Sequence, residues 1–344
     1  MWIHKKEKQK VNEELKQKIR EILLKRYGVD INEAVCRFST QNYAFIFPEK
    51  PYMIRVSISP KKSRSEILSE LMWVDDLKPF KQTICEPNPS LNGLLLEEFE
   101  IDGKLYRASM FRTARGNIKL TTEMKPMFFI CVGDLLGAIH HVSTNERELG
   151  IKYSRKKMSD TFGELINRVK EKIPPEIEER IRAAQREVDA LPEELGRYGI
   201  CHGDFHINNF FVEENNIWLF DFDGCTYANY MYDVASFVQA CFLMGYKAGE
   251  DCRKVLYDDI LPYFKIGYEL NKECDGNYWE HLELFITYRV AMAYLSLLEI
   301  DECGVVDNLE QIRQFLGYVI SQGDVLGAMT VALKKQAGGH KEGK

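Results

Sequence analysis

Residues 201–209 read CHGDFHINN, and residues 221–224 read DFDG after a short apolar run with the composition of a strand. Asp204 and Asn209 are separated by five positions, so a tight loop brings their side chains back toward one point. The strand then delivers the carboxylate of Asp221 opposite them. These two segments predict a polar site built from one loop and one strand end.

The residue types at this site suit the transfer of a phosphoryl group. That chemistry uses an Asp to accept the proton of an acceptor hydroxyl, an Asn five positions on to hold a metal ion, and an Asp after a short strand to hold Mg²⁺. Oxygen ligands of this kind are those that Mg²⁺ prefers. We therefore expect Asp204 to orient and deprotonate an acceptor hydroxyl, and Asn209 and Asp221 to ligate Mg²⁺.

Hydrophobic periodicity around this site divides the chain into two parts. The first part is expected to contain a helix over 11–27, strands over 43–47 and 52–56, a helix over 63–77 and a hairpin of strands 94–99 and 105–111. The second part is expected to be helical over 128–142, 160–172, 176–190, 232–245, 251–270, 278–299 and 308–333, with a strand region at 199–223. The order predicts an α+β protein with an antiparallel-sheet N-terminal lobe at 1–111, a hinge at 112–118, a helical C-terminal lobe at 119–336 and a flexible tail at 337–344.

Length and composition are those of a globular protein. The chain has 344 residues, of which 45% are hydrophobic and 28% charged, and these values exclude disordered, collagen-like and coiled-coil classes for its body. The best membrane candidate, 127–139, is short and carries Asp134, and residues 1–18 lack the apolar core of a secretory signal. We therefore expect no membrane span and no membrane partner.

The nine cysteines are odd in number and irregularly spaced, and none forms a Cys-x-x-Cys pair. This pattern favours free thiols over disulfides or a zinc site. It predicts a reducing, cytoplasmic location. The sequence indicates no particular oligomeric state.

The net charge of −6 is unevenly distributed. Residues 201–344 hold 11 Lys and Arg against 22 Asp and Glu, a balance of −11, whereas residues 1–200 carry +5. This distribution argues against nucleic acid as a partner. It permits an anionic ligand near the first part and a cationic one near the second, the alternative being two solvated surfaces of different composition.

The loop and the strand end together resemble a known family. The pattern His202-Gly203-Asp204-x-His206-x-x-Asn209, followed by Asp221-Phe222-Asp223, is similar to that of the aminoglycoside phosphotransferase and choline kinase-like family. The resemblance extends roughly over residues 30–300. It implies a two-lobed protein-kinase-like fold, ATP and Mg²⁺ as cofactors, and transfer of the γ-phosphate to a hydroxyl of a small molecule.

The resemblance implies that the first lobe binds the nucleotide. Arg55 is similar to the family's basic residue on its third strand, which contacts phosphates, and Glu70 in the next helix would pair with it. An Arg in place of the more usual Lys can still bind phosphate, and can do so bidentately. A plain surface ion pair between the two is the alternative interpretation.

Three further residues are candidates for nucleotide contacts. Asn42 ends the stretch 39–42, which stands where the family has its phosphate-covering loop but contains no glycine. Phe111 and Thr113 lie where an adenine would meet the connector between the lobes, and only their backbone groups would matter there.

The resemblance also assigns supporting residues in the second lobe. Residues 133–140 are similar to the family's Leu-Gly-x-x-His helix, and Asp233 would brace the catalytic loop. His202 and His206 are expected to support the loop through hydrogen bonds rather than to carry protons. A glycine follows Asp223 where many relatives have an acidic residue, which leaves the role of Asp223 open.

Three rival functions fit the sequence less well than a small-molecule kinase does. A Ser/Thr protein kinase needs a long segment after the metal-binding Asp, ending in Ala-Pro-Glu, but Asp221 and Asp233 are only 12 apart and no Ala-Pro-Glu occurs. A dinuclear metal hydrolase needs more clustered histidines than the seven scattered ones present. A catalytically weak binding module fits poorly with an intact set of Asp204, Asn209 and Asp221.

The acceptor is left open between aminoglycosides, choline or ethanolamine, homoserine and sugars. The acidic second part favours a cationic acceptor, with contacts from late acidic residues such as Glu280, Glu283 and Asp301. Aromatic residues on the late helices could cage a quaternary amine or pack in the core, namely Tyr278, Trp279 and Tyr288.

Overall fold

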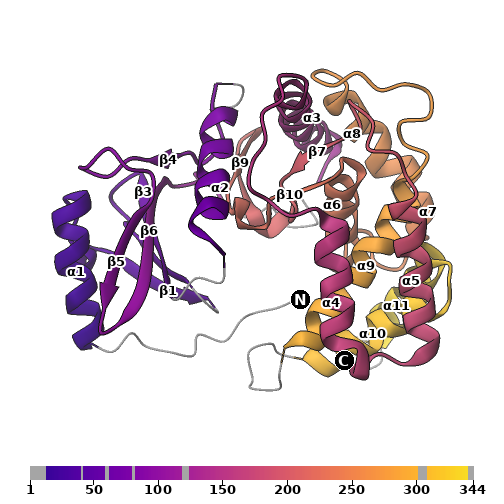
Figure 1. Cartoon of the computed structure of the whole chain (residues 1–344). Helices are drawn as coiled ribbons and strands as arrows, with labels where there is room; N and C mark the ends of the chain where they lie inside the picture. Colours follow the sequence, from indigo (N-terminus) through magenta and orange to yellow (C-terminus); the bar gives the residue numbers. More distant parts are fainter. Residues whose placement is uncertain are drawn as a thin grey trace.

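The computed structural model describes residues 13–39, 42–58, 62–79, 82–117, 124–300 and 308–339. A small lobe with an antiparallel sheet lies beside a larger, mainly helical lobe (Figure 1). This is the two-lobed α+β fold predicted from the sequence. Parts of two predicted features lie outside the described residues, namely Thr40 and Gln41 of the phosphate-covering loop and residues 340–344 of the tail.

The sheet of the small lobe has the strand order β1-β2-β3-β6-β4. Strands β5 and β4 both pair with the same edge of β6. β5 pairs with the first part of β6, and β4 pairs with the last part of β6. Strand β2 alternates in burial, and its inward Tyr43 and Phe45 pack with Ile19 and Leu23 of helix α1 (Glu13–Tyr27). The strands are β1 Val35–Ser39, β2 Asn42–Ile46, β3 Tyr52–Ile58, β4 Pro87–Asn88, β5 Glu97–Ile101 and β6 Lys104–Arg112.

Helix α2 (Arg64–Leu77) is anchored in both lobes. A capping box fixes its N-terminus, and its buried Leu71 packs with Leu96 of the small lobe. Trp73 near its C-terminal end belongs to the core of the large lobe and meets the ring of Phe222 edge-on at 5.4 Å. Because α2 carries Glu70, this double anchoring fixes the position of that carboxylate relative to both lobes.

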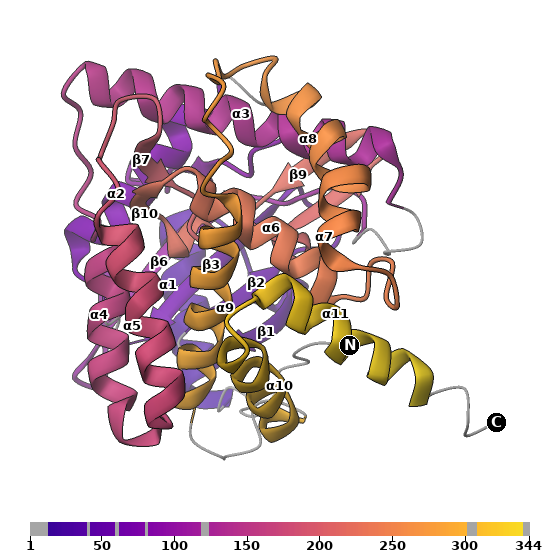
Figure 2. The same ribbon diagram turned by 90° about the vertical axis from the view of Figure 1, so that its right-hand side faces the viewer.

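The large lobe contains two small antiparallel sheets of two strands each among its helices, and Figure 2 shows α4 and α5 beside α9 and α10. Strand β7 leads into residues 202–209, and β9 leads into residues 221–224. The strands are β7 Tyr198–Cys201 paired with β10 Thr226–Asn229, and β8 Phe210–Glu213 paired with β9 Asn216–Leu219. The helices are α3 Pro126–Glu148, α4 Met158–Val169, α5 Pro175–Asp189, α6 Met231–Leu243, α7 Cys252–Lys254, α8 Leu261–Tyr268, α9 Leu282–Glu299, α10 Leu309–Ser321 and α11 Val325–Gly339.

Helices α3 and α8 cross at backbone contact distance. A Cβ atom added at Gly133 would lie 2.1 Å from the carbonyl oxygen of Phe264, and one at Gly137 would lie 2.3 Å from that of Tyr268. No side chain fits at such distances, so glycine is required at both positions. The two glycines of the Leu-Gly-x-x-His region therefore serve helix packing.

Gly137→Ala is expected to destabilise the protein. The added methyl group meets backbone rather than a movable side chain, and overpacking of this kind costs about 1–3 kcal/mol. The free energy of unfolding from denaturant titration measures the effect. Gly163→Ala is the matched control, since its Cβ would meet only the flexible end of Gln185 at 3.4 Å, and alanine there stabilises a helix by about 0.5–1 kcal/mol. Equal midpoints for the two variants would contradict the packing argument.

Helix α3 is longer than the predicted 128–142 and has the length and composition to cross a membrane. However, 72% of its most apolar window is buried inside the structure. Its apolar residues are therefore packed into the core of the large lobe.

The structure corrects two of the predicted helices. The predicted helix 308–333 is two helices, because Gly323 adopts a left-handed conformation (φ +80°) and Asp324 accepts a hydrogen bond from the backbone of the next helix. The predicted helix 251–270 is α7, a π-helical turn at Val255–Ile260 and then α8, whose first turn contains a proline without a backbone N–H.

Eight cysteines lie in the described residues, and all are free thiols as predicted.

Candidate active site

The loop at 202–209 brings Asp204 and Asn209 together. The side-chain Nδ2 of Asn209 donates to the backbone oxygen of Asp204 at 2.8 Å and to its carboxylate at 3.2 Å. The Nε2 atom of His206 lies 3.1 Å from the same carboxylate, whose side chain is 46% exposed. The amide nitrogen of Asn209 is thus occupied, and its amide oxygen has no hydrogen-bond partner among the described residues.

Asp233 and His202 hold this loop from behind. The fully buried carboxylate of Asp233 accepts the backbone N–H groups of His202 at 2.7 Å and Gly203 at 2.8 Å. The His202 ring accepts the N–H of Asp204 at 3.3 Å, and its other nitrogen lies 3.2 Å from the carbonyl of Phe220. Burial lowers the pKa of His202, so a neutral ring bridges the loop and the strand end.

The second segment lies directly against the loop. Gly203 has φ +82°, and a Cβ atom there would come within 2.0 Å of the carbonyl oxygen of Gly224. Asp221 adopts a left-handed conformation with φ 66° and ψ 59°. Such a conformation is costly for a residue other than glycine and is concentrated at functional sites. Among the described residues no side chain pairs with the Asp221 carboxylate.

A cavity of about 370 Å³ lies between the sheet and the second lobe. Its lining brings together the five candidates for nucleotide contacts and one candidate metal ligand, namely Asn42, Arg55, Glu70, Phe111, Thr113 and Asp221. Arg55 and Glu70 face each other at 2.9 Å, and their side chains are 13% and 1% exposed. The pair is therefore not a surface ion pair. Burial opposes the charge of the Arg55 guanidinium, but the carboxylates of Glu70, Asp223 and Asp221 raise its pKa.

Asp223 ties the second segment to the small lobe. Its carboxylate lies 2.8 Å from the ammonium group of Lys62, and its backbone oxygen accepts a hydrogen bond from Arg155 at 2.5 Å. Burial would raise the pKa of Asp223, but the charges of Arg55 and Lys62 lower it overall. These contacts give Asp223 a positioning role that the sequence left open.

Arg289 is a site residue that the sequence analysis missed. The side chain of Arg289 is buried on α9. One terminal nitrogen of its guanidinium lies 3.3 Å from the Asp204 carboxylate. The other donates to the backbone oxygen of Gly203 at 3.3 Å and to the hydroxyl of Tyr232 at 2.6 Å. Burial would raise the pKa of Asp204, but His206, Arg289 and His202 lower it well below its usual range. Its one signal in the sequence is that Arg289 is the only basic residue of the mainly apolar helix α9.

Arg289→Met is expected to lower kcat about 10²-fold, the cost of losing precise orientation at a reacting group. Loss of the guanidinium also raises the pKa of Asp204, so the acidic limb of the pH–rate profile moves to higher pH. A purely structural role would leave that limb in place. The measurement is kcat against pH at saturating substrates, with Arg186→Met, an exposed Arg of α5, as the control that keeps the wild-type profile.

The late residues proposed as acceptor contacts do not form one site. Glu283 is engaged by Arg253 at 3.0 Å, and Asp301 lies outside the described residues. The rings of Tyr278 and Trp279 pack with Tyr268 in the core. Tyr288 stacks on Phe162 instead, so the three aromatic residues do not make a common cage. Glu280 is exposed beside His281 at 3.2 Å.

The fold and this loop define a kinase-like phosphotransferase. The model of the phosphotransferase enzyme family, APH, matches residues 38–254, which is more than half of the chain. The chain belongs to the phosphotransferase enzyme family.

Several proteins are similar to this chain over most of their length. Amicoumacin kinase of Bacillus subtilis (strain 168) is 20% identical over 83% of this chain and 86% of its own. Among solved structures, amicoumacin kinase hAmiN in complex with AMP-PNP, Ca²⁺ and Ami has a TM-score of 0.78 at 18% identity, covering 91% of this chain and 96% of that one. The microcompartment-associated aminopropanol kinase has a TM-score of 0.64 at 15% identity, covering 91% and 99%.

Proposed function

We propose that this protein is an ATP- and Mg²⁺-dependent kinase that transfers the γ-phosphate to a hydroxyl of a small molecule. The observation that carries the proposal is the position of Asp204 and Asn209, within 3.2 Å of each other, beside the segment that brings Asp221 into the cavity with Arg55 and Glu70. The nucleotide complex of the relative hAmiN supports a nucleotide as donor. Free cysteines throughout the described residues support a cytoplasmic location.

Asn209 and Asp221 have the donor set that a Mg²⁺ ion requires. The amide oxygen of Asn209 and the carboxylate of Asp221 have no protein partner among the described residues. Both are hard oxygen ligands, and two such ligands leave room around the ion for phosphate oxygens and water. When bound, the metal ion neutralises charge on the phosphates and orients them. Arg55, fixed by Glu70, would contact the phosphates from the other wall of the cavity.

Asp204 would bind the acceptor hydroxyl. Because the pKa of Asp204 is lowered, its carboxylate is ionised but only weakly basic. It would therefore orient the hydroxyl first and take the proton once the oxygen has begun to bond to phosphorus, as suits a loose transition state. Catalysis would then depend mainly on alignment and on charge stabilisation.

A small acceptor is favoured over a protein. Asp221 is followed within 12 residues by Asp233 at the start of α6, and the chain between them forms a short turn and strand β10. Little chain remains to cradle a peptide. The acceptor that we propose is cationic, of the aminoglycoside, choline or ethanolamine, or homoserine-like kind, since the second part of the chain carries a balance of −11.

A screen of nucleotide-dependent phosphorylation across a panel of such compounds tests the function. We further expect that, in a matched pair of hydroxyl compounds, the amine-bearing one has the higher kcat/KM, and that its advantage shrinks as salt screens the charges. The measurement is kcat/KM for both compounds at low and high ionic strength. Equal values, unaffected by salt, would count against a cationic acceptor while leaving the kinase assignment intact.

A further inference from the structure

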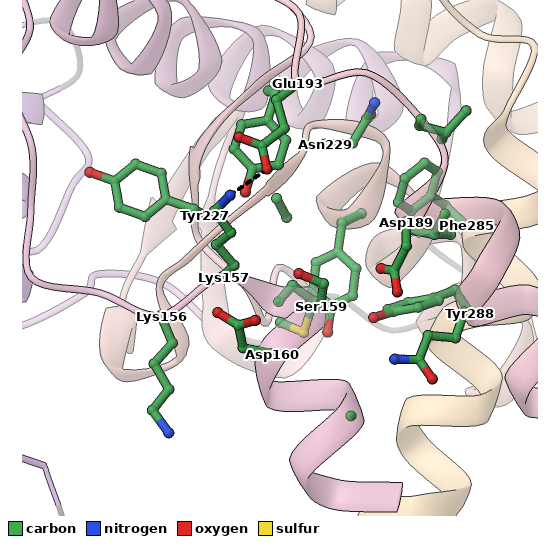
Figure 3. A pocket seen from close by; sticks show the side chains of 18 of the residues that line it. Lys156, Lys157, Ser159, Asp160, Asp189, Glu193, Tyr227, Asn229, Phe285 and Tyr288 are labelled. Carbon is green, nitrogen blue, oxygen red and sulfur yellow. Dashed lines mark hydrogen bonds and ion pairs between the residues drawn. The ribbon is translucent and has the colours of Figure 1, made fainter.

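A second pocket, of about 690 Å³, lies in the large lobe between α4, α5, β10 and α9 (Figure 3). Neither Asp204 nor Arg289 lines it. Tyr232 forms a wall between the pocket and the loop, because its ring lines the pocket while its hydroxyl accepts a hydrogen bond from Arg289 at 2.6 Å. The pocket is thus a neighbour of the catalytic loop, and it shares no lining residue with the nucleotide cavity.

The charges in this pocket are unbalanced. Its two lysines are already paired, Lys156 with Glu164 at 2.8 Å and Lys157 with Glu193 at 2.6 Å. The second of these pairs is the dashed contact in Figure 3. Two further carboxylates line the pocket, and no cation of the described residues pairs with either of them. An excess of negative charge therefore faces this space.

The two unpaired carboxylates are those of Asp160 on α4 and Asp189 at the end of α5. Burial and the charge of Asp160 both raise the pKa of Asp189. The two groups therefore repel each other across the pocket, and a cation between them would relieve that repulsion. All four of Ser159, Asp160, Asp189 and Tyr288 line the pocket, and in Figure 3 the Asp189 carboxylate lies beside the Tyr288 hydroxyl while the Asp160 carboxylate lies on the other side of Ser159.

Tyr288 gives an independent sign of a ligand. The residue is completely buried, yet its hydroxyl has no hydrogen-bond partner among the described residues. Its ring is held firmly, stacked on Phe162 at 4.0 Å and edge-on to Tyr232 at 6.1 Å. A buried hydroxyl without a partner is costly, and this one is aimed into the pocket beside Asp189.

We propose that this pocket binds the ammonium group of a small organic ligand. Asp160 and Asp189 supply the opposite charge, the Tyr288 hydroxyl accepts a hydrogen bond from the ammonium, and the rings of Phe285 and Tyr288 contact the carbon frame. The ammonium group could belong to the acceptor itself or to a separate amine. The proposal does not depend on the proposed phosphoryl transfer, since binding is defined by this pocket alone.

Binding of an aromatic diamine tests the site. The probe is 1,4-bis(aminomethyl)benzene, titrated calorimetrically into the full chain at low ionic strength, and the neutral comparison is 1,4-benzenedimethanol. We expect the diamine to bind about tenfold more tightly than the diol, because each exposed ion pair contributes only modestly. Equal affinity for the two compounds would overturn the proposal.

Variants locate the binding to this pocket. The double variant Asp160→Asn/Asp189→Asn should weaken diamine binding about tenfold, and Tyr288→Phe should weaken it several-fold. The matched control Glu179→Gln/Glu187→Gln removes the same charge from exposed positions of α5 that do not line the pocket, and should bind like wild type. Equal weakening by both double variants would show a general charge effect and overturn the site.

Kinetics with an amine-bearing acceptor separates the two sources of the ammonium group. If the amine is the acceptor's own, Asp160→Asn/Asp189→Asn raises KM for that acceptor while kcat and the KM of a neutral acceptor stay unchanged. If the ligand is separate, the same variant loses the probe but keeps every KM. Both results support the site, and an absence of turnover would count against the proposed kinase function while leaving the binding test in force.

Discussion

Asp204→Asn is expected to lower kcat about 10²- to 10⁴-fold, the usual contribution of a general base, with no change in nucleotide affinity. The amide keeps the shape of the side chain but neither attracts nor accepts the hydroxyl proton. Nucleotide affinity should persist because Asp204 does not line the cavity that holds Arg55 and Glu70. The loop should also persist, since Asn209 still donates to the backbone oxygen of residue 204 at 2.8 Å.

Steady-state turnover at saturating substrates, together with calorimetric titration of the nucleotide, measures both parts of this expectation. Asp258→Asn is the matched control, because Asp258 is an exposed carboxylate in the π-helical turn and makes no described contact with the site. It should retain wild-type turnover. Near-normal turnover by Asp204→Asn would show that another group handles the acceptor proton.

Much of the site could be predicted because it is local in the sequence. Asp204 and Asn209 share one loop, and Asp221 follows the next hairpin, so their spacing alone limits where their side chains can meet. The pair of Arg55 and Glu70 required the family resemblance, since nothing in a strand and a helix taken separately says that they face each other. The structure adds that this pair is buried.

The residues that sequence reasoning missed come from distant helices. Arg289 reaches Asp204 from α9 across 85 positions of sequence, and Asp160, Asp189 and Tyr288 meet only where α4, α5 and α9 pack together. Periodicity identifies the apolar face of each helix but not which faces adjoin. The acidic balance of the second part therefore drew attention to late residues such as Glu283, whose charge is already paired with Arg253.

The break in the predicted helix 308–333 has a different cause. Gly323 followed by Asp324 is a stop and a start signal that can be recognised in a sequence. The apolar pattern continues on both sides of it, so periodicity alone joined α10 and α11. Here a local backbone preference outweighed the hydrophobic pattern.

Asp221→Ala is expected to abolish productive binding of the metal–nucleotide complex, because it removes a carboxylate ligand from a hard cation. The backbone at this position complicates the variant. Asp221 has a positive φ of 66°, and a residue such as alanine is strained there by about 1–2 kcal/mol. Asn tolerates this conformation better, so Asp221→Asn removes the charge with less disturbance to the backbone.

In the wild type, we expect Mg²⁺ to increase the affinity for the nucleotide. Asp221→Asn should lose most of this increase, and turnover should fall with it, whereas its affinity for the nucleotide in EDTA should stay at the wild-type value. The second part follows because Arg55, the proposed phosphate contact on the opposite wall, is unchanged and still paired with Glu70 at 2.9 Å. Calorimetric titration of the nucleotide with Mg²⁺ and with EDTA separates the two contributions, and turnover against Mg²⁺ concentration gives the midpoint. If Asp221→Asn turned over with the wild-type Mg²⁺ midpoint, Asp221 would not be a metal ligand, and the strain at its backbone would need another explanation.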